Sequence, residues 1–208
     1  MAVQILAPSV HTPPQTKMTF AEFLDWCDED TLAEFIEGEI VMTSPASINH
    51  QQVGSLLETL LRVHVEKHDL GKVLRAPFVM RLPELNRARE PDILFVAHAN
   101  AHLLRPTFLD GAADLVVEII SPESFMRDHA EKFIEYERAG VPEYWLIDPE
   151  RQVAEFYELG SAKHYQPALV ADGIYRSRVV AGFWLRPAWL WQSPLPATLD
   201  LLREMKIL

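Results

Sequence analysis

The segment DLVVEIISPE, residues 114–123, decides the fold and also contains its least expected residue. Leu115, Val116, Val117, Ile119 and Ile120 form an apolar run that indicates a buried strand. Glu118 stands in the middle of this run. Burial of an unpaired carboxylate is strongly unfavourable, so we expect a compensating partner for Glu118. That expectation makes Glu118 a candidate functional residue.

The chain after this strand has the pattern of one strand–helix–strand unit. Asp128 and Glu131 have the spacing of a helix-capping signal, and the predicted helix runs from there to Gly140. The segment PEYWLID, residues 142–148, indicates a second buried strand. The connection between the two strands should therefore be a right-handed crossover.

Helical and hairpin signals precede the central strand. Thr19 and Glu22 form a capping box that predicts the start of a helix, and residues 34–42, EFIEGEIVM, have the pattern of a β-hairpin. A long helix is predicted to begin at Ser47 and to end at Gly71. Its buried face has apolar residues at helical spacing: Val53, Leu56, Leu57, Leu60 and Leu61.

The remaining segments complete a mixed sheet. Residues 72–82 and 91–97 are predicted strands separated by a polar turn at Glu84–Arg89, and residues 98–113 are predicted to form a long loop. Shorter antiparallel strands and a helix around 198–206 should follow. The predicted fold class is mixed α/β (α+β), with a β-sheet flanked by helices and an N-terminal helix and β-hairpin.

Composition restricts the classes of protein to consider. The chain has 208 residues, of which 49% are hydrophobic, and these figures fit one globular domain. We predict a flexible arm at 1–17, the domain at 18–192, and a C-terminal extension with a short helix at 193–208. The single cysteine, Cys27, excludes an internal disulfide and a zinc site built on several cysteines.

Charge and hydropathy predict the surroundings in which the chain works. No apolar run reaches the roughly 18 residues of a membrane span, and the first residues lack a signal-peptide pattern, so we expect a cytoplasmic protein without a membrane partner. The net charge of −11 should repel nucleic acid at long range. A nucleic-acid function would therefore require a local basic patch or divalent cations.

A second carboxylate stands at the head of a predicted strand, where Asp92 follows Pro91. Two carboxylates on neighbouring strands repel each other, and a divalent cation removes that repulsion. Oxygen ligands suit Mg²⁺ or Mn²⁺, which can polarise a phosphodiester and lower the pKa of an attacking water. The alternative is that Asp92 caps a turn and Glu118 pairs with a basic side chain.

Several segments, in this order, resemble the Uma-two family of bacterial restriction endonucleases within the PD-(D/E)XK nuclease superfamily. They are EFIEGEIV, SINHQQV, EPDILFV, DLVVEIISPES, DHAEKFIEYERAGVPEYWLIDP and GFWLRP. The resemblance spans residues 18–192. It implies a restriction-endonuclease-like fold, Mg²⁺ or Mn²⁺ as cofactor, nucleic acid as substrate with DNA expected first, and a homodimer.

The resemblance also implies roles for individual residues. The superfamily pattern is Pro-Asp, then an acidic residue, one spacer and a lysine, which matches Asp92 and Glu118 but places Ile120 where the lysine belongs. Lys132 on the following helix is the expected substitute, because its long side chain can reach back to the strand. The alternative for Lys132 is an i,i+4 ion pair with Asp128, worth a few tenths of a kcal/mol.

Two further residues complete the predicted site. Glu34 aligns with an acidic residue of the family and is predicted as a third metal ligand, although Glu37 and Glu39 lie close in the sequence. His50, at the start of the long helix, matches a family histidine and is predicted to contact a phosphate or to orient a metal-bound water. The alternative for His50 is a cap or a residue at the edge of the core.

The predicted function is therefore that of a metal-dependent endonuclease. A second possibility is a catalytically silent nuclease fold that serves in binding or dimerisation, which the acidic charge favours. A third is a metallohydrolase of a small phosphoester. The segment HVEKH has two histidines at i,i+4 but lacks the glutamate position of zinc proteases, so we predict no catalytic zinc there.

Overall fold

The parallel pair of strands β8 and β9 forms the centre of the protein. The computed structural model describes residues 13–14, 16–27, 31–42, 46–121, 124 and 126–208, so most of the predicted arm at 1–17 lies outside the described residues. A six-stranded sheet has the order β11-β10-β9-β8-β6-β3. These strands are, in that order, Tyr165–Pro167, Val153–Leu159, Glu143–Asp148, Leu115–Ile119, Ile93–Ala97 and Gly71–Arg75. The two predicted buried strands are thus confirmed as neighbours, parallel to each other.

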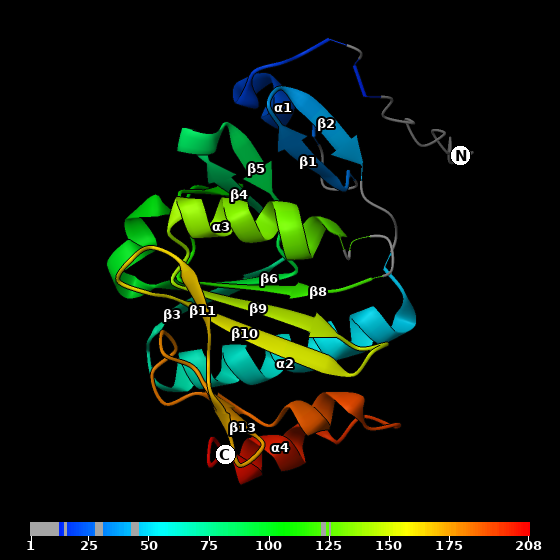
Figure 1. Ribbon diagram of the computed structural model, residues 1–208, viewed down its shortest axis with the longest axis vertical. Coiled ribbons are helices and arrows are strands. Elements are labelled where there is room, and N and C mark those ends of the chain that lie inside the picture. The colour runs from blue at the N-terminus through cyan, green and yellow to red at the C-terminus, as the bar shows by residue number, and fades with distance from the viewer. Residues whose placement is uncertain (1–12, 15, 28–30, 43–45, 122–123, 125) are drawn as a thin grey trace, which may run out of the picture.

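Strand β8 is buried on both faces because a helix covers each face (Figure 1). Helix α2, Ile48–Lys67, packs on the face that carries Val117 and Ile119, and α3, Phe133–Ala139, lies on the opposite face with Val116. Successive side chains of a strand point to opposite faces. Glu118 therefore points to the α3 face.

A second sheet of five strands lies on the α3 side of the six-stranded sheet (Figure 1). Its order is β2-β1-β5-β4-β7, and the predicted hairpin forms two of these strands. The strands are, in that order, Glu39–Met42, Ala33–Ile36, Arg87–Arg89, Val79–Leu82 and Phe108–Asp110. Helix α1, Phe20–Trp26, packs on this sheet through Phe23, and the predicted capping box of Thr19 and Glu22 is confirmed.

The predicted strand 72–82 is divided between the two sheets. Pro77, which has no N–H group to donate to a ladder, stands between β3 and β4. The predicted polar turn at Glu84–Arg89 contains a 3₁₀ turn, Pro83–Leu85, and also strand β5. The predicted loop 98–113 contains a 3₁₀ segment, His98–Leu103, and strand β7. These strands have only three residues each, too few for an alternating pattern to be recognised.

Two predicted helix ends differ from the structure. Helix α2 ends at Lys67, and Gly71 instead begins β3, where a Cβ atom would lie 2.1 Å from the Val96 carbonyl oxygen. The helix predicted from Asp128 to Gly140 begins before Asp128. It includes a π-helical segment, Arg127–Lys132, that continues into α3. Asp128 is buried there and makes no side-chain cap, so the predicted capping signal was wrong. Gly140 does end α3, as predicted.

The C-terminal part packs against α2 on the far face of the six-stranded sheet (Figure 1). It contains β12, Val170–Ala171; β13, Ile174–Arg176; β14, Trp184–Leu185; the 3₁₀ segment Pro187–Trp191; and α4, Thr198–Glu204. The predicted short helix is confirmed, and the division of the chain at residue 192 stays a prediction. Within the described residues, no helix is both long and apolar enough to span a membrane.

A buried carboxylate joins this C-terminal part to the central sheet. Glu143, at the start of β9, is 0% exposed. It accepts hydrogen bonds from Trp145 Nε1, Tyr175 Oη, Ser177 Oγ and the backbone N–H groups of Arg178 and Val179. Both carboxylate oxygens are used, so the charge is satisfied entirely by donors of the protein.

We expect Glu143→Gln to lower the free energy of unfolding by about 2–4 kcal/mol. The amide nitrogen of the glutamine would face hydrogen-bond donors where the glutamate presents an oxygen. Urea denaturation followed by circular dichroism measures the change. Glu66→Gln, on the exposed side of α2, is the matched control and should change stability by less than about 0.5 kcal/mol. Equal stabilities of the two variants would contradict this account of Glu143.

Candidate active site

The residues predicted from the sequence line one cavity of about 620 Å³. They are Glu34 of β1, His50 of α2, Asp92 just before β6, Glu118 of β8 and Lys132 from the π-helical segment. Their segments are far apart in the chain. The fold therefore brings the five predicted residues together in one cavity.

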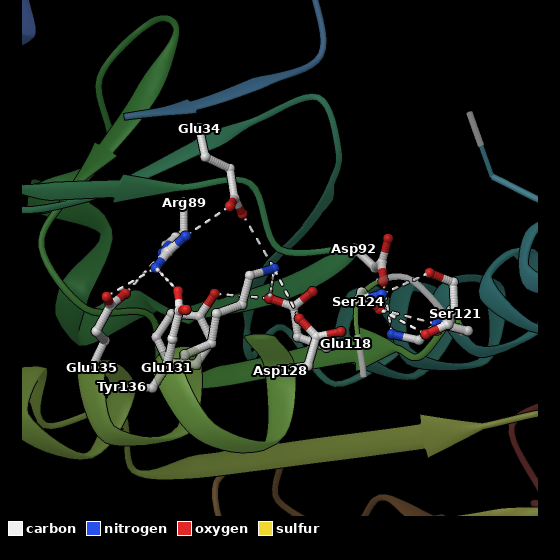
Figure 2. Close-up of polar contacts among 12 residues, drawn as sticks. Glu34, Arg89, Asp92, Glu118, Ser121, Ser124, Asp128, Glu131, Glu135 and Tyr136 are labelled. Carbon is white, nitrogen blue, oxygen red and sulfur yellow. Dashed lines mark hydrogen bonds and ion pairs between the residues drawn. The ribbon is translucent and has the colours of Figure 1, made fainter. Parts of the chain in front are cut away.

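Asp92 and Glu118 occupy neighbouring positions on adjacent antiparallel strands. Ile93 pairs with Val117, so the next step of the register places Asp92 opposite Glu118 on the same face. Asp92 Oδ2 accepts a hydrogen bond of 2.7 Å from the Ile119 backbone N–H. Figure 2 shows the carboxylates of Asp92 and Glu118 near the end of the sheet at which β6 begins. The Asp92 side chain is 23% exposed, so it remains accessible from the cavity.

Glu118 has the partners that its burial requires. It is 3% exposed, and its Oε1 accepts hydrogen bonds from Lys132 Nζ at 2.9 Å and from Tyr136 Oη at 2.8 Å. Burial raises the pKa of the Glu118 carboxyl above its ordinary value; Lys132 opposes this rise, and the charges of Asp128 and Asp92 add to it. Additional positive charge near Asp92 would therefore stabilise the ionised form of Glu118.

Lys132 is the centre of a buried group of three carboxylates, those of Glu34, Glu118 and Asp128, which Figure 2 labels. Its Nζ lies 2.9 Å from Glu118 Oε1, 3.2 Å from Glu34 Oε1 and 3.3 Å from Asp128 Oδ1. Burial acts to lower the pKa of Lys132, but the three carboxylates outweigh it and raise that pKa. The alternative ion pair with Asp128 is therefore present, as one part of a larger buried arrangement.

Lys132 lies beside Glu118 although strand β8 has no lysine of its own. Ile120 is 4% exposed and packs in the hydrophobic cluster on the α3 face. Lys132 reaches the same face from the helical segment that follows the strand. The structure thus places an ammonium group beside Glu118 although the strand position holds an apolar residue.

Glu34 connects Lys132 to a second buried cation. Its Oε2 accepts a 2.8 Å hydrogen bond from Arg89 Nη1, and Arg89 also donates to both carboxylate oxygens of Glu135, from Nε at 2.8 Å and from Nη2 at 2.9 Å (Figure 2). Arg89 is 0% exposed. A continuous series of ion pairs, Glu135–Arg89–Glu34–Lys132–Glu118, therefore holds the Lys132 ammonium group in place.

Sequence reasoning missed Arg89, Glu135 and the role of Asp128. Arg89 lies in RARE, which has the composition of an exposed turn, and nothing in those letters indicates burial. Tyr136 packs in the core with its hydroxyl on Glu118.

His50 contacts Asp92 from the first turn of α2. Its Nε2 lies 3.3 Å from Asp92 Oδ2, and the Ser47 hydroxyl caps the helix by accepting from the His50 backbone N–H at 3.2 Å. Burial acts to lower the pKa of His50, whereas the hydrogen bond with Asp92 and the charges of Asp92 and Asp128 raise it above its ordinary value. The histidine thus interacts with the accessible carboxylate.

The donor set can be compared with the needs of a divalent cation. Among the described residues, no three or more His, Cys, Asp or Glu side chains are arranged as ligands of one metal ion. Asp92 and Glu118 nevertheless fit Mg²⁺, which is usually held by one or two carboxylates and takes waters and substrate phosphates as its other ligands. Asp128 Oδ1 is buried and forms an ion pair with Lys132 at 3.3 Å, without a hydrogen-bond partner among the described residues. The role of Glu34 as a ligand stays a prediction, since both of its oxygens already contact cations.

His64 and His98 have structural partners. His64 Nε2 lies 3.0 Å from the Ala181 carbonyl oxygen, and its ring packs against those of His68 and Phe183. His98 pairs with Asp69.

Comparisons with known proteins identify the family and the fold. The sequence profile of the Uma2 family, described as "Putative restriction endonuclease", matches residues 20–188. The structure is similar to the crystal structure of a "putative nuclease belonging to DUF820" from Anabaena variabilis ATCC 29413, with a TM-score of 0.70 and 18% sequence identity over 84% of this chain and 97% of that chain. The comparison with curated proteins gave no match. The fold is restriction-endonuclease-like, and the chain belongs to the Uma2 family of restriction-endonuclease relatives.

Proposed function

We propose that this protein is a metal-dependent endonuclease that hydrolyses phosphodiester bonds of nucleic acid with Mg²⁺ or Mn²⁺. The observation that supports this most directly is the position of Lys132. Its Nζ, which comes from a helical segment, lies 2.9 Å from Glu118 Oε1. The same cavity contains Asp92, just before the adjacent strand β6. The arrangement supplies the two acids and the amine of the superfamily pattern without the lysine on the strand.

Each residue has a defined part in this proposal. Asp92 and Glu118 would hold the cation, with Glu34 as the predicted third ligand, and the cation would polarise the phosphodiester and lower the pKa of the attacking water. Lys132 keeps a positive charge at the cavity because three carboxylates surround it, so its part is to stabilise the negative charge that develops on the phosphate. His50 orients Asp92 by contacting its Oδ2.

A catalytically silent nuclease fold remains the second candidate. The observation in its favour is that Lys132 already pairs with three carboxylates in the absence of substrate. A metallohydrolase of a small phosphoester is the third, favoured by the acidic lining of the cavity. The homodimer and the cytoplasmic location stay predictions that accompany the first candidate.

We expect Asp92→Asn and Glu118→Gln each to lower metal-dependent cleavage at least about a hundredfold, because each removes a charge that the reaction needs. The measurement is the initial rate on labelled DNA and RNA, single- and double-stranded, with Mg²⁺ or Mn²⁺. Glu84→Gln, outside the cavity lining, is the control and should retain the wild-type rate. Cleavage at the wild-type rate by both Asp92→Asn and Glu118→Gln would refute the site.

Mn²⁺ binding tests the same residues without any substrate. Isothermal titration calorimetry should detect Mn²⁺ binding to the wild-type protein and an affinity at least about tenfold weaker for Asp92→Asn. Mn²⁺ binding without cleavage of any substrate would favour the silent fold. No heat of binding with the wild type would remove the basis for both metal-dependent candidates.

We expect Lys132→Met to abolish cleavage and also to lower the free energy of unfolding by about 3–5 kcal/mol, because Glu118, Glu34 and Asp128 lose their shared cation. Lys72→Met, at an exposed position of β3, is the matched control for both measurements. Cleavage is to be compared at a temperature at which circular dichroism shows the variant folded. A folded Lys132→Met protein with wild-type cleavage would exclude the proposed part of Lys132.

A further inference from the structure

Four exposed apolar side chains lie in, or next in sequence to, the segments that line the charged cavity. Leu32 and Met42, exposed by 37% and 47%, line the cavity itself. Ile48, exposed by 79%, stands between the lining residues Ser47 and Asn49, and Met126, exposed by 72%, directly precedes the lining residue Arg127. These four residues, here called the apolar rim, come from four separate segments of the chain. Large apolar groups that are left in water next to a polar site indicate contact with a ligand.

The reacting groups of the proposed nuclease lie at the floor of the cavity. Glu118 and Lys132 are each 3% exposed, so a phosphodiester must enter the cavity to approach them. The volume of about 620 Å³ falls within the range of pockets for small ligands, roughly 300–1,000 Å³. A strand inside a duplex must unstack locally to bend into such a space, whereas a single strand bends without breaking base pairs.

Two arginines of the cavity lining are available for phosphate groups. Among the described residues, Arg75 contacts Gln51 and no carboxylate, and the charge of Arg127 acts on Glu34 without a direct ion pair. Arg75 Nη2 lies 3.4 Å from Gln51 Oε1, and Arg127 Nε is buried without a hydrogen-bond partner among the described residues. Two guanidinium groups are few against the charge of a duplex, about one negative charge per 1.7 Å, in a chain of net charge −11. They suit the lower charge density of one strand.

We propose that the cavity selects single-stranded nucleic acid over duplex, with Arg75 and Arg127 on the phosphates and the apolar rim against unstacked bases. This inference rests on the proposed nuclease function and names its substrate class. The faces of the bases are apolar and are exposed only when a strand is unpaired. The outer surface of a duplex consists of phosphates and sugars, which form no favourable apolar contact with Ile48 or Met126.

Binding tests the inference independently of cleavage. Fluorescence anisotropy with the full chain in Ca²⁺ compares labelled single-stranded DNA, single-stranded RNA and the DNA duplex of the same sequence. We expect at least one of the single strands to bind about tenfold or more tightly than the duplex, and the two single-stranded arms decide between DNA and RNA. A duplex that binds as tightly as both single strands would overturn the inference.

Variants identify which contacts cause the preference. Ile48→Gln and Met126→Gln should each weaken single-strand binding about threefold to tenfold, without a change of charge. Leu169→Gln is the matched control, because Leu169 is 82% exposed and does not line the cavity. Arg75→Gln and Arg127→Gln should each lower the slope of log affinity against log salt by about 0.7. An equal effect of the rim variants and the control would overturn the part assigned to the rim.

The outcomes separate this inference from the proposed function. Rim-dependent binding of a single strand without metal-dependent cleavage would support the inference and overturn the nuclease. Metal-dependent cleavage of duplex at a rate equal to or above that of either single strand would support the nuclease and overturn the inference.

Discussion

The ion pair between Lys132 and Glu118 is the constraint on which the arrangement of the central sheet depends. Strand β8 is buried on both faces, so a carboxylate in its middle needs a cation within the protein. That cation comes from the segment that crosses from β8 to β9, at 2.9 Å. The helix must therefore lie over the strand that precedes it, at one position along its length. The crossover is fixed both by apolar packing and by one charged contact.

A buried ion pair of this kind contributes less to stability than its short distance suggests. Removing both ions from water costs several kcal/mol each in effective terms, and the attraction between them offsets this only with additional hydrogen bonds. Here Tyr136 donates to Glu118 and Glu34 pairs with Lys132, while Arg89 donates in turn to Glu34. An apolar pair would fill the same space at lower cost. Stability alone therefore does not account for so many charges in one place.

Much of the fold could be predicted from the sequence, since its long elements have clear patterns. The buried strands at 115–119 and 143–148, the first capping box and the apolar face of α2 follow from local spacing. The short strands β5 and β7 could not be predicted, because three residues give no periodicity. The Asp128–Glu131 spacing is the same for a cap and for a buried contact, and only the tertiary structure distinguishes them.

The candidate site was only partly predictable from the sequence. Asp92 and Glu118 stand out as acids beside apolar strands, and Lys132 was identified through the family resemblance rather than through its spacing. Arg89 was not predictable, because its burial depends on Glu34 and Glu135, whose segments are distant in the sequence. Local composition indicates which residues are charged. It does not indicate which charges are enclosed by other parts of the chain.

Glu143 has a consequence for the order in which the protein folds during synthesis. Its hydrogen-bond donors at Tyr175, Ser177, Arg178 and Val179 leave the ribosome more than thirty residues after the carboxylate itself. Until they emerge, Trp145 is the one donor of the observed set that is present, and water must solvate the rest of the carboxylate. The start of β9 therefore obtains its full set of hydrogen bonds only after residue 179 has emerged.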